Sequence, residues 1–213
     1  MVEVAPLVNH PVGRALEQYL LDTYKDDGLR RWPIGSITEV FFHCLGIISF
    51  VDDVTKSKRN PGQVDAALDF LLELVKLPAI SASQLAIICS YKANVSLVER
   101  RRERLRYAAL AEMPPAATVD SFQGREADII VAIMGTTEAV GPGFTTDEHR
   151  LNVLLSRQKS GLLILGDINV LGDNKTFIHP ETITRPSTII GLLQRWYISQ
   201  SVHEVQWPEY QEL

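Results

Sequence analysis

Two stretches of the 213-residue chain concentrate side chains that could contact a charged ligand. The first, Thr118–Glu126, has the sequence Thr-Val-Asp-Ser-Phe-Gln-Gly-Arg-Glu, in which many hydrogen-bonding groups surround a glycine that permits close backbone approach. The second, Arg150–Lys159, has the sequence Arg-Leu-Asn-Val-Leu-Leu-Ser-Arg-Gln-Lys. Arg150 and Arg157 would lie two turns apart on about the same face of a helix. A cation held at the ligand-binding edge of an α/β sheet suits an anion such as phosphate.

Short apolar segments alternate with segments of helical periodicity, which predicts an α/β fold with a parallel sheet and helices on both faces. Apolar runs predict strands at Val40–Val51, Leu85–Cys89, Ala117–Val119, Asp128–Gly135 and Leu162–Leu165, and an extended tail at Val202–Trp207. Helical spacing predicts helices at Pro11–Tyr24, Gln63–Leu77, Tyr91–Leu110, Asp147–Arg157 and Ser187–Ser199. Ligands of such sheets bind beyond the carboxyl ends of the strands, and we expect the charged side chains of the second stretch at that edge.

The residue types in these stretches are equally compatible with structural roles, because short motifs often occur by chance. Asp120 could cap a turn, and Gln123 could satisfy backbone groups. Arg157 could pair with Glu126 or Asp128. Spacing alone therefore leaves a functional and a structural interpretation open.

The composition limits the kind of partner. With 21 Lys and Arg against 26 Asp and Glu, the formal net charge is -5, which excludes a uniformly basic nucleic-acid wrapper. Any nucleic-acid contact must therefore be local. Cys44 and Cys89 lie in apolar segments, which predicts buried free thiols, and they lack the spacing of a zinc site. No apolar run reaches the ~18 residues of a membrane span, and the default setting is intracellular.

Two basic clusters receive a simple interpretation. Arg100–Arg102 and Arg104 predict a solvated helical face. Lys56, Lys58 and Arg59 predict a solvated loop.

The two stretches resemble the motor motifs of superfamily 1 helicases, in the group that contains the nonsense-mediated-decay RNA helicase. The family pattern Ser/Thr-Val-Asp-x-Phe-Gln-Gly-x-Glu is intact at Thr118–Glu126. The pattern Arg-Leu-Asn-Val-x-Leu-Thr/Ser-Arg-x-Arg is nearly intact at Arg150–Lys159, where Lys159 replaces the last arginine. Ile87–Tyr91 is similar to the family's Ile-Ile-Thr-Pro-Tyr turn, with Cys89 and Ser90 in place of Thr and Pro.

The resemblance implies a RecA-like fold of the P-loop NTPase type, with residues 1–213 forming a single second motor domain and the first motor domain absent. ATP and Mg²⁺ would be bound mainly by that first domain, because the chain has no Gly-x-x-x-x-Gly-Lys-Ser/Thr phosphate loop. The chain alone is therefore expected to be inactive as an ATPase. By the same resemblance, Arg157 would be the arginine finger that stabilises charge on the γ-phosphoryl group.

Two further sets of residues follow from the resemblance. The nucleotide side of the cleft would be lined by Gln123, Gly124, Glu126, Arg150 and Lys159. The single strand would meet Ser90, Tyr91, Thr118, Val119 and Asp120. No residue is assigned to a metal.

The implied partners are the first RecA-like domain and single-stranded RNA or DNA, without a membrane, in the nucleus or cytoplasm. One alternative is a degenerate, non-hydrolysing helicase-like domain that acts as a protein or nucleic-acid binding module, and Lys159 and Ser90 support it. Another is an unrelated α/β phosphate-binding enzyme such as a nucleotide kinase, which would need a phosphate loop of its own.

Overall fold

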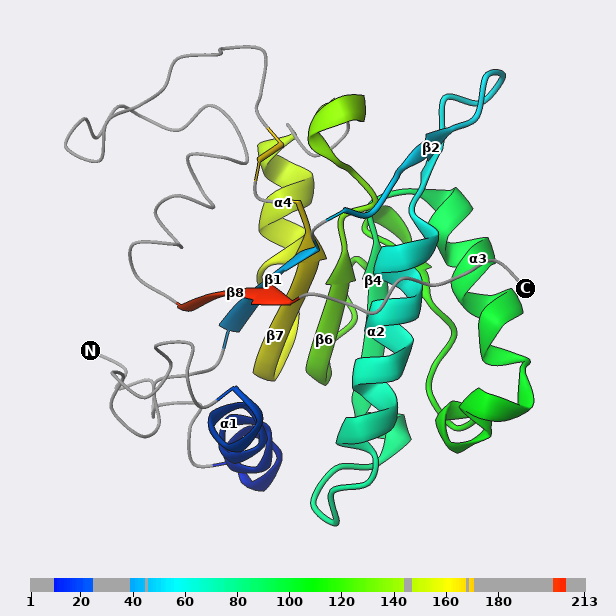
Figure 1. Ribbon diagram of the computed structural model, residues 1–213. Coiled ribbons are helices and arrows are strands. Elements are labelled where there is room, and N and C mark those ends of the chain that lie inside the picture. The colour runs from blue at the N-terminus through cyan, green and yellow to red at the C-terminus, as the bar shows by residue number, and fades with distance from the viewer. Residues whose placement is uncertain are drawn as a thin grey trace, which may run out of the picture.

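A six-stranded parallel sheet forms the centre of the protein, with the strand order β5-β4-β6-β7-β1-β8 (Figure 1). The computed structural model describes residues 10–24, 39–44, 46–143, 147–167, 169–170 and 201–205. The strands are β1 (Glu39–Cys44), β4 (Leu85–Cys89), β5 (Ala117–Thr118), β6 (Ala127–Ile133), β7 (Gln158–Gly166) and β8 (Ser201–Val205). The predicted α/β class with a parallel sheet is confirmed.

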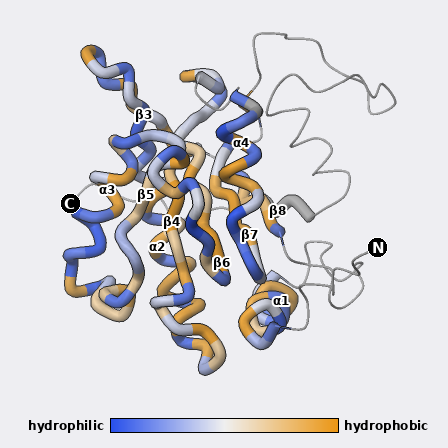
Figure 2. The backbone as a smooth tube through the Cα atoms, turned by 180° about the vertical axis from the view of Figure 1, so that it is seen from behind, coloured by the Kyte–Doolittle hydropathy of each residue, from blue (hydrophilic) through white to orange (hydrophobic). Residues whose placement is uncertain are grey.

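Helical segments cover both faces of the sheet (Figures 1 and 2). One face carries the α-helices α1 (Pro11–Thr23), α2 (Pro61–Leu74) and α3 (Lys92–Arg102), and the 3-10 helix η4 (Leu105–Leu110). The opposite face carries α4 (Glu148–Leu154) and the 3-10 helix η5 (Asp120–Phe122). Among the described helices, none has the length and apolar character needed to cross a membrane.

The central parts of the strands are mostly apolar because both faces of the sheet are covered. Successive side chains of a strand point to opposite faces. In β4, Leu85, Ile87 and Cys89 therefore join the core beneath α2, while Ala86 and Ile88 join the core beneath α4. The predicted strand at Leu85–Cys89 matches β4 to the residue.

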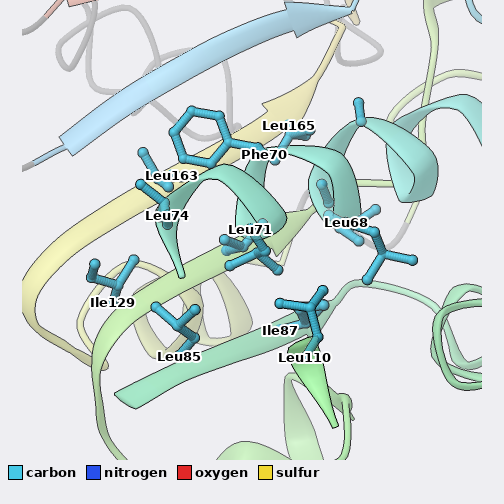
Figure 3. Packing of buried hydrophobic residues seen from close by; sticks show 14 of the residues in the cluster. Leu68, Phe70, Leu71, Leu74, Leu85, Ile87, Leu110, Ile129, Leu163 and Leu165 are labelled. Carbon is cyan, nitrogen blue, oxygen red and sulfur yellow. The ribbon is translucent and has the colours of Figure 1, made fainter. Parts of the chain in front are cut away.

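Helix α2 supplies much of the first core. Leu68, Leu71 and Leu74 are fully buried against the sheet (Figure 3). The helix begins at Pro61, two residues before the predicted start, because the Asn60 side chain accepts a hydrogen bond from the Gln63 amide at 2.9 Å and caps the first turn.

The prediction of one strand over Val40–Val51 is wrong. Strand β1 ends at Cys44, and Gly46 has a φ of +69°, a conformation that interrupts extended pairing. The segment β2 (Phe50–Val51) then pairs antiparallel with β3 (Lys58–Arg59) in a separate hairpin that projects from the body of the domain (Figure 1). The apolar run continues across the break because Phe50 and Val51 are exposed hydrophobic residues of this hairpin.

The predicted helix over Tyr91–Leu110 is also too long. Helix α3 ends at Arg102, and η4 follows after a turn. The Arg102 guanidinium donates hydrogen bonds to the carbonyls of Leu110, Met113 and Pro114, which requires the chain to turn back toward the helix end.

Other helix limits differ by smaller amounts. The prediction for Pro11–Tyr24 is confirmed as α1. The predicted helix at Ser187–Ser199 lies outside the described residues, as does Trp207, while the start of the extended tail is confirmed as β8.

Candidate functional site

The two motif stretches meet the sheet at both of its edges. Strands of a parallel sheet begin at one edge, here called the amino edge, and end at the other, here called the carboxyl edge. Thr118 pairs with Cys89, the last residue of β4, at the carboxyl edge. Ala127 pairs with Gln158 at the amino edge. Strand β6 has seven residues, so the two edges lie roughly 20 Å apart at ~3.3 Å per residue.

At the carboxyl edge, Thr118 and Ser121 close a tight turn. The Thr118 amide donates to the Ser121 hydroxyl at 3.0 Å, and the two hydroxyl oxygens lie 2.6 Å apart. Val119 between them is buried in the core beneath α4, so only its backbone is available to a ligand. The turn thus presents hydroxyls and backbone groups beside the carboxylate of Asp120.

Ser90 and Tyr91 also lie at the carboxyl edge, but their side chains are buried at 4% and 9% exposure. The Ser90 amide donates to the carbonyl of Ile133, which continues the pairing of β4 with β6. The Tyr91 hydroxyl donates to the carbonyl of Pro142 at 3.3 Å. The structure therefore places the Tyr91 side chain against the segment that follows β6 and buries the Ser90 side chain, and the predicted contact of both with a strand stays a prediction.

Arg150 lies at the carboxyl edge of the sheet. Its guanidinium bonds the Asp120 carboxylate, with Nε 3.2 Å from Oδ1 and Nη2 3.2 Å from Oδ2. Asp147 caps α4 by accepting from the amides of His149 and Arg150. Asp120 thus forms an ion pair with Arg150, while the carboxylate that caps a helix here belongs to Asp147.

Arg157 lies at the other edge. Helix α4 ends at Leu154, and the Ser156 hydroxyl donates to the carbonyl of Asn152 at the helix end. The Arg157 carbonyl then accepts from the Ala127 amide at 3.2 Å, which ties the arginine to the start of β6. Its Nη2 donates to Ser156 Oγ at 3.0 Å, and its buried Nε has no partner among the described residues.

This placement corrects two expectations. Arg150 and Arg157 do not share a helix face, because α4 stops three residues before Arg157 and β7 begins directly after it. Arg157 and Lys159 also lie at the amino edge instead of the carboxyl edge, because they precede or open β7. Of the three cations in the second stretch, all of which the structure describes, Arg150 alone lies at the carboxyl edge, where ligands of α/β sheets were expected.

The turn that connects the two edges contains the remaining nucleotide candidates. Phe122 is buried and anchors it, whereas Gln123, Gly124 and Glu126 are exposed. Gly124 has a φ of +79°, which only glycine adopts without strain. Lys159 Nζ lies 3.9 Å from Glu126 Oε2, with both side chains more than half exposed. The structure therefore brings Glu126, Arg157 and Lys159 together at the amino edge.

Sequence reasoning missed the role of Lys58. Its side chain is 8% exposed instead of solvated, and Nζ donates to the carbonyls of Val140 and Gly141 at 2.8 and 2.7 Å. Nζ also lies 5.7 Å from the centre of the Tyr91 ring. Burial lowers the pKa of the lysine. Lys58 is buried and Arg59 is exposed, and local polarity does not predict this difference because both residues are cationic.

The basic face predicted for α3 is only partly solvated. Arg100 and Arg104 are exposed, but Arg101 forms a salt bridge with the buried carboxylate of Asp65, and Arg102 binds the carbonyls named above. These two arginines are structural, and no signal within their own helix distinguishes them from Arg100.

The prediction for the cysteines is confirmed. Cys44 and Cys89 are free and buried, and burial raises the pKa of both thiols, to about 12 for Cys44.

Comparison with known proteins identifies the family. Residues 18–169 match the family model of an AAA domain. Regulator of nonsense transcripts 1 of Caenorhabditis elegans is 32% identical over 143 residues, which cover 66% of this chain and 13% of that protein. DNA polymerase alpha-associated DNA helicase A of Saccharomyces cerevisiae is 31% identical over 117 residues, or 54% of this chain and 16% of that protein. ATP-dependent helicase upf1 of Schizosaccharomyces pombe is 45% identical over 64 residues, or 30% of this chain and 7% of that protein. The chain thus spans a small fraction of the length of the relatives it matches.

Proposed function

This chain belongs to the AAA-domain family and to the superfamily 1 helicases of the nonsense-mediated-decay type, and from that premise we propose that residues 1–213 form the second RecA-like motor domain of an ATP-dependent helicase or translocase. The domain supplies an arginine finger and part of the single-strand surface. A first motor domain supplies the phosphate loop and the acid that binds Mg²⁺. Neither motor domain hydrolyses ATP efficiently by itself.

The observation that carries the proposal is that the Arg157 guanidinium, which donates to Ser156 Oγ, has no carboxylate partner among the described residues. Within the part of the chain that the structure describes, Arg101, Arg106 and Arg150 each pair with a carboxylate. No described carboxylate lies within the 4 Å of an ion pair from Arg157, and its Nε is unpartnered. A cation that is fixed by its backbone but free of an internal counter-ion can bind an anion from another domain.

Arginine-finger chemistry requires a cation at the transferring phosphoryl group. Charge builds on the γ-phosphoryl oxygens in the transition state, and a positioned guanidinium stabilises it. Glu126 and Gln123 stand on the neighbouring turn, where Glu126 is available to a ribose hydroxyl or to the water near the γ-phosphate. Arg150 and Lys159 add positive charge to the proposed nucleotide set, with Lys159 beside Glu126 and Arg150 at the carboxyl edge, where it pairs with Asp120.

The strand surface is proposed at the carboxyl edge. Thr118, through its hydroxyl, and Val119 and Asp120, through their backbone, would hold a strand by neutral groups rather than by bulk charge, while the Asp120 carboxylate pairs with Arg150. Ser90 and Tyr91 contribute from beneath, through the backbone at the end of β4. This explains how a domain with a net charge of -5 can bind a polyanion.

The test is ATP turnover by a protein that joins this chain to a first motor domain with a phosphate loop, measured with and without single-stranded RNA and DNA. The proposal predicts turnover that either strand stimulates, while the 213-residue chain alone is silent. The better activator identifies the substrate class. Rapid turnover by the chain alone would contradict the division of labour between the two domains.

A second candidate function rests on the ion pair between Lys159 and Glu126. A lysine lacks the bidentate fork of arginine, and here it neutralises a carboxylate proposed for the nucleotide. These features favour a degenerate domain that binds protein or nucleic acid without hydrolysis. If the two-domain protein is silent with both strands and Lys159→Arg restores turnover, the degenerate interpretation is correct.

A further inference from the structure

A surface groove lies along the outer side of β5, the outermost strand at one side of the sheet. Its volume is about 410 Å³, within the range of sites for small ligands. Helix α3 forms one wall through Lys92 and Val95, and the turn around η5 forms the other through Ser121 and Arg125. Thr118 opens onto the same groove. Thr118 has a role in the proposed strand surface, but no role proposed above involves Lys92 or Arg125.

The two cations of the groove are uncommitted. Among the described residues, no carboxylate pairs with Lys92 or Arg125. The Arg125 guanidinium lies 4.6 Å from the centre of the Phe122 ring, which orients the group while its N–H edges stay free to donate. On α3, by contrast, Arg101 and Arg102 already bind a carboxylate and backbone carbonyls.

Between these cations the groove offers hydroxyls and an apolar wall. Thr118 and Ser121 place their hydroxyl groups at one side, within the turn they close together. Val95 and Pro115 supply apolar surface. Positive charge and hydroxyls suit a phosphodiester, while an apolar wall suits the sugar or base attached to it.

We propose that this groove binds one unit of the single nucleic-acid strand, with a phosphate held by Lys92 and Arg125 and the attached sugar or base against Val95 and Pro115. The inference rests on the proposed function, and it adds Lys92 and Arg125 to the strand surface at Thr118. The net charge of the whole chain is negative, so two cations that line one groove give a polyanion a local site of positive charge. Arg125 also shares its turn with Gln123, Gly124 and Glu126, so a strand in the groove contacts the segment proposed to face ATP.

The test measures binding of fluorescently labelled single-stranded RNA and DNA to the 213-residue chain by anisotropy over a range of salt concentrations. The test variant is Lys92→Gln with Arg125→Gln. The matched control is Arg100→Gln with Arg104→Gln, which removes the same charge from two exposed positions outside the groove. Circular dichroism melting curves of both variants confirm that they are folded.

The proposal predicts that the test variant binds more weakly and that its slope of log affinity against log salt falls by about 0.7, because the two cations together neutralise one phosphate. The control keeps the wild-type slope. If wild type binds and the two variants behave alike, the groove is not part of the strand path, while the proposed function stands. If wild type binds no strand, the strand surface and the groove both fail. Equal affinity for a poly-glutamate peptide of matched charge would overturn the assignment in favour of an acidic protein.

Discussion

The salt bridge between Arg101 and Asp65 joins α3 to α2 beneath the sheet. Asp65 is 4% exposed, and both of its carboxylate oxygens accept from Nη1 of Arg101. Burial raises the pKa of Asp65, and the Arg101 charge acts in the opposite direction. We predict that Arg101→Met destabilises the domain strongly, because it leaves a buried carboxylate without its counter-ion while it keeps the apolar stem of the side chain.

The magnitude follows from the burial of the two partners. Removing one partner of a buried pair typically costs about 3–5 kcal/mol. The Arg101 side chain is 19% exposed, so water partly solvates the carboxylate left behind, and we expect about 3 kcal/mol, near the low end of that range. Arg100→Met on the same helix is the control, and as an exposed change it should stay within about 0.5 kcal/mol of wild type. Asp65→Leu with Arg101→Met should recover most of the loss, since no charge is then stranded.

The assay is urea unfolding of each variant at several pH values. An acid whose pKa is raised in the folded state reduces stability above that pKa, and the penalty fades as the pH falls through it. Loss of Arg101 raises the Asp65 pKa further, so the difference from wild type should shrink as the pH falls toward the ordinary value of 3.8. A loss below about 1 kcal/mol at pH 7, or a double variant no better than Arg101→Met, would refute the reasoning.

Two further perturbations test the carboxyl edge. Lys58→Met removes two hydrogen bonds to the carbonyls of Val140 and Gly141, so amide hydrogen exchange in the segment after β6 should accelerate. Lys56→Met, on the exposed part of the hairpin, should leave that exchange unchanged. Equal exchange rates in the two variants would contradict the role assigned to Lys58. Gly135→Ala should destabilise the domain by roughly 2–3 kcal/mol in thermal or urea unfolding, because φ is +71° and the new Cβ would clash with Asn94 Nδ2. Gly124→Ala has a similar φ but open space, so only the backbone strain of about 1 kcal/mol should remain, and equal losses at the two sites would show that the clash is absent.

The sheet was predictable because its strands are short runs of apolar residues with both faces covered. Leu85–Cys89 is apolar throughout, and the neighbouring strand β6 is apolar and buried from Ile129 to Ile133. The hairpin after β1 was not predictable, because exposed Phe50 and Val51 have the same apolar character as a buried strand. The hydrophobicity of a residue does not indicate whether its side chain will be buried in the folded protein.

The site was predictable as a set of residue types but not as an arrangement. Each of the two motif stretches is continuous in sequence, yet each is divided between the two edges of the sheet, which lie roughly 20 Å apart. Thr118 and Arg150 lie at the carboxyl edge, whereas Glu126 and Lys159 lie at the amino edge. Long-range partners decide the roles of the charged residues: Arg101 needs Asp65 on α2, and Lys58 needs the carbonyls that follow β6. The local sequence around a charged residue does not predict such partners.

Arg157 tests the central claim most directly. In a protein with both motor domains, Arg157→Ala should reduce ATP turnover by ~10³-fold or more, with modest loss of nucleotide affinity and unchanged affinity for the strand. Arg100→Ala changes an exposed arginine of α3 outside both motif stretches, and this control should retain full turnover. Unchanged turnover in Arg157→Ala would remove this arginine from the mechanism and contradict the assignment of the chain as the domain that supplies the finger.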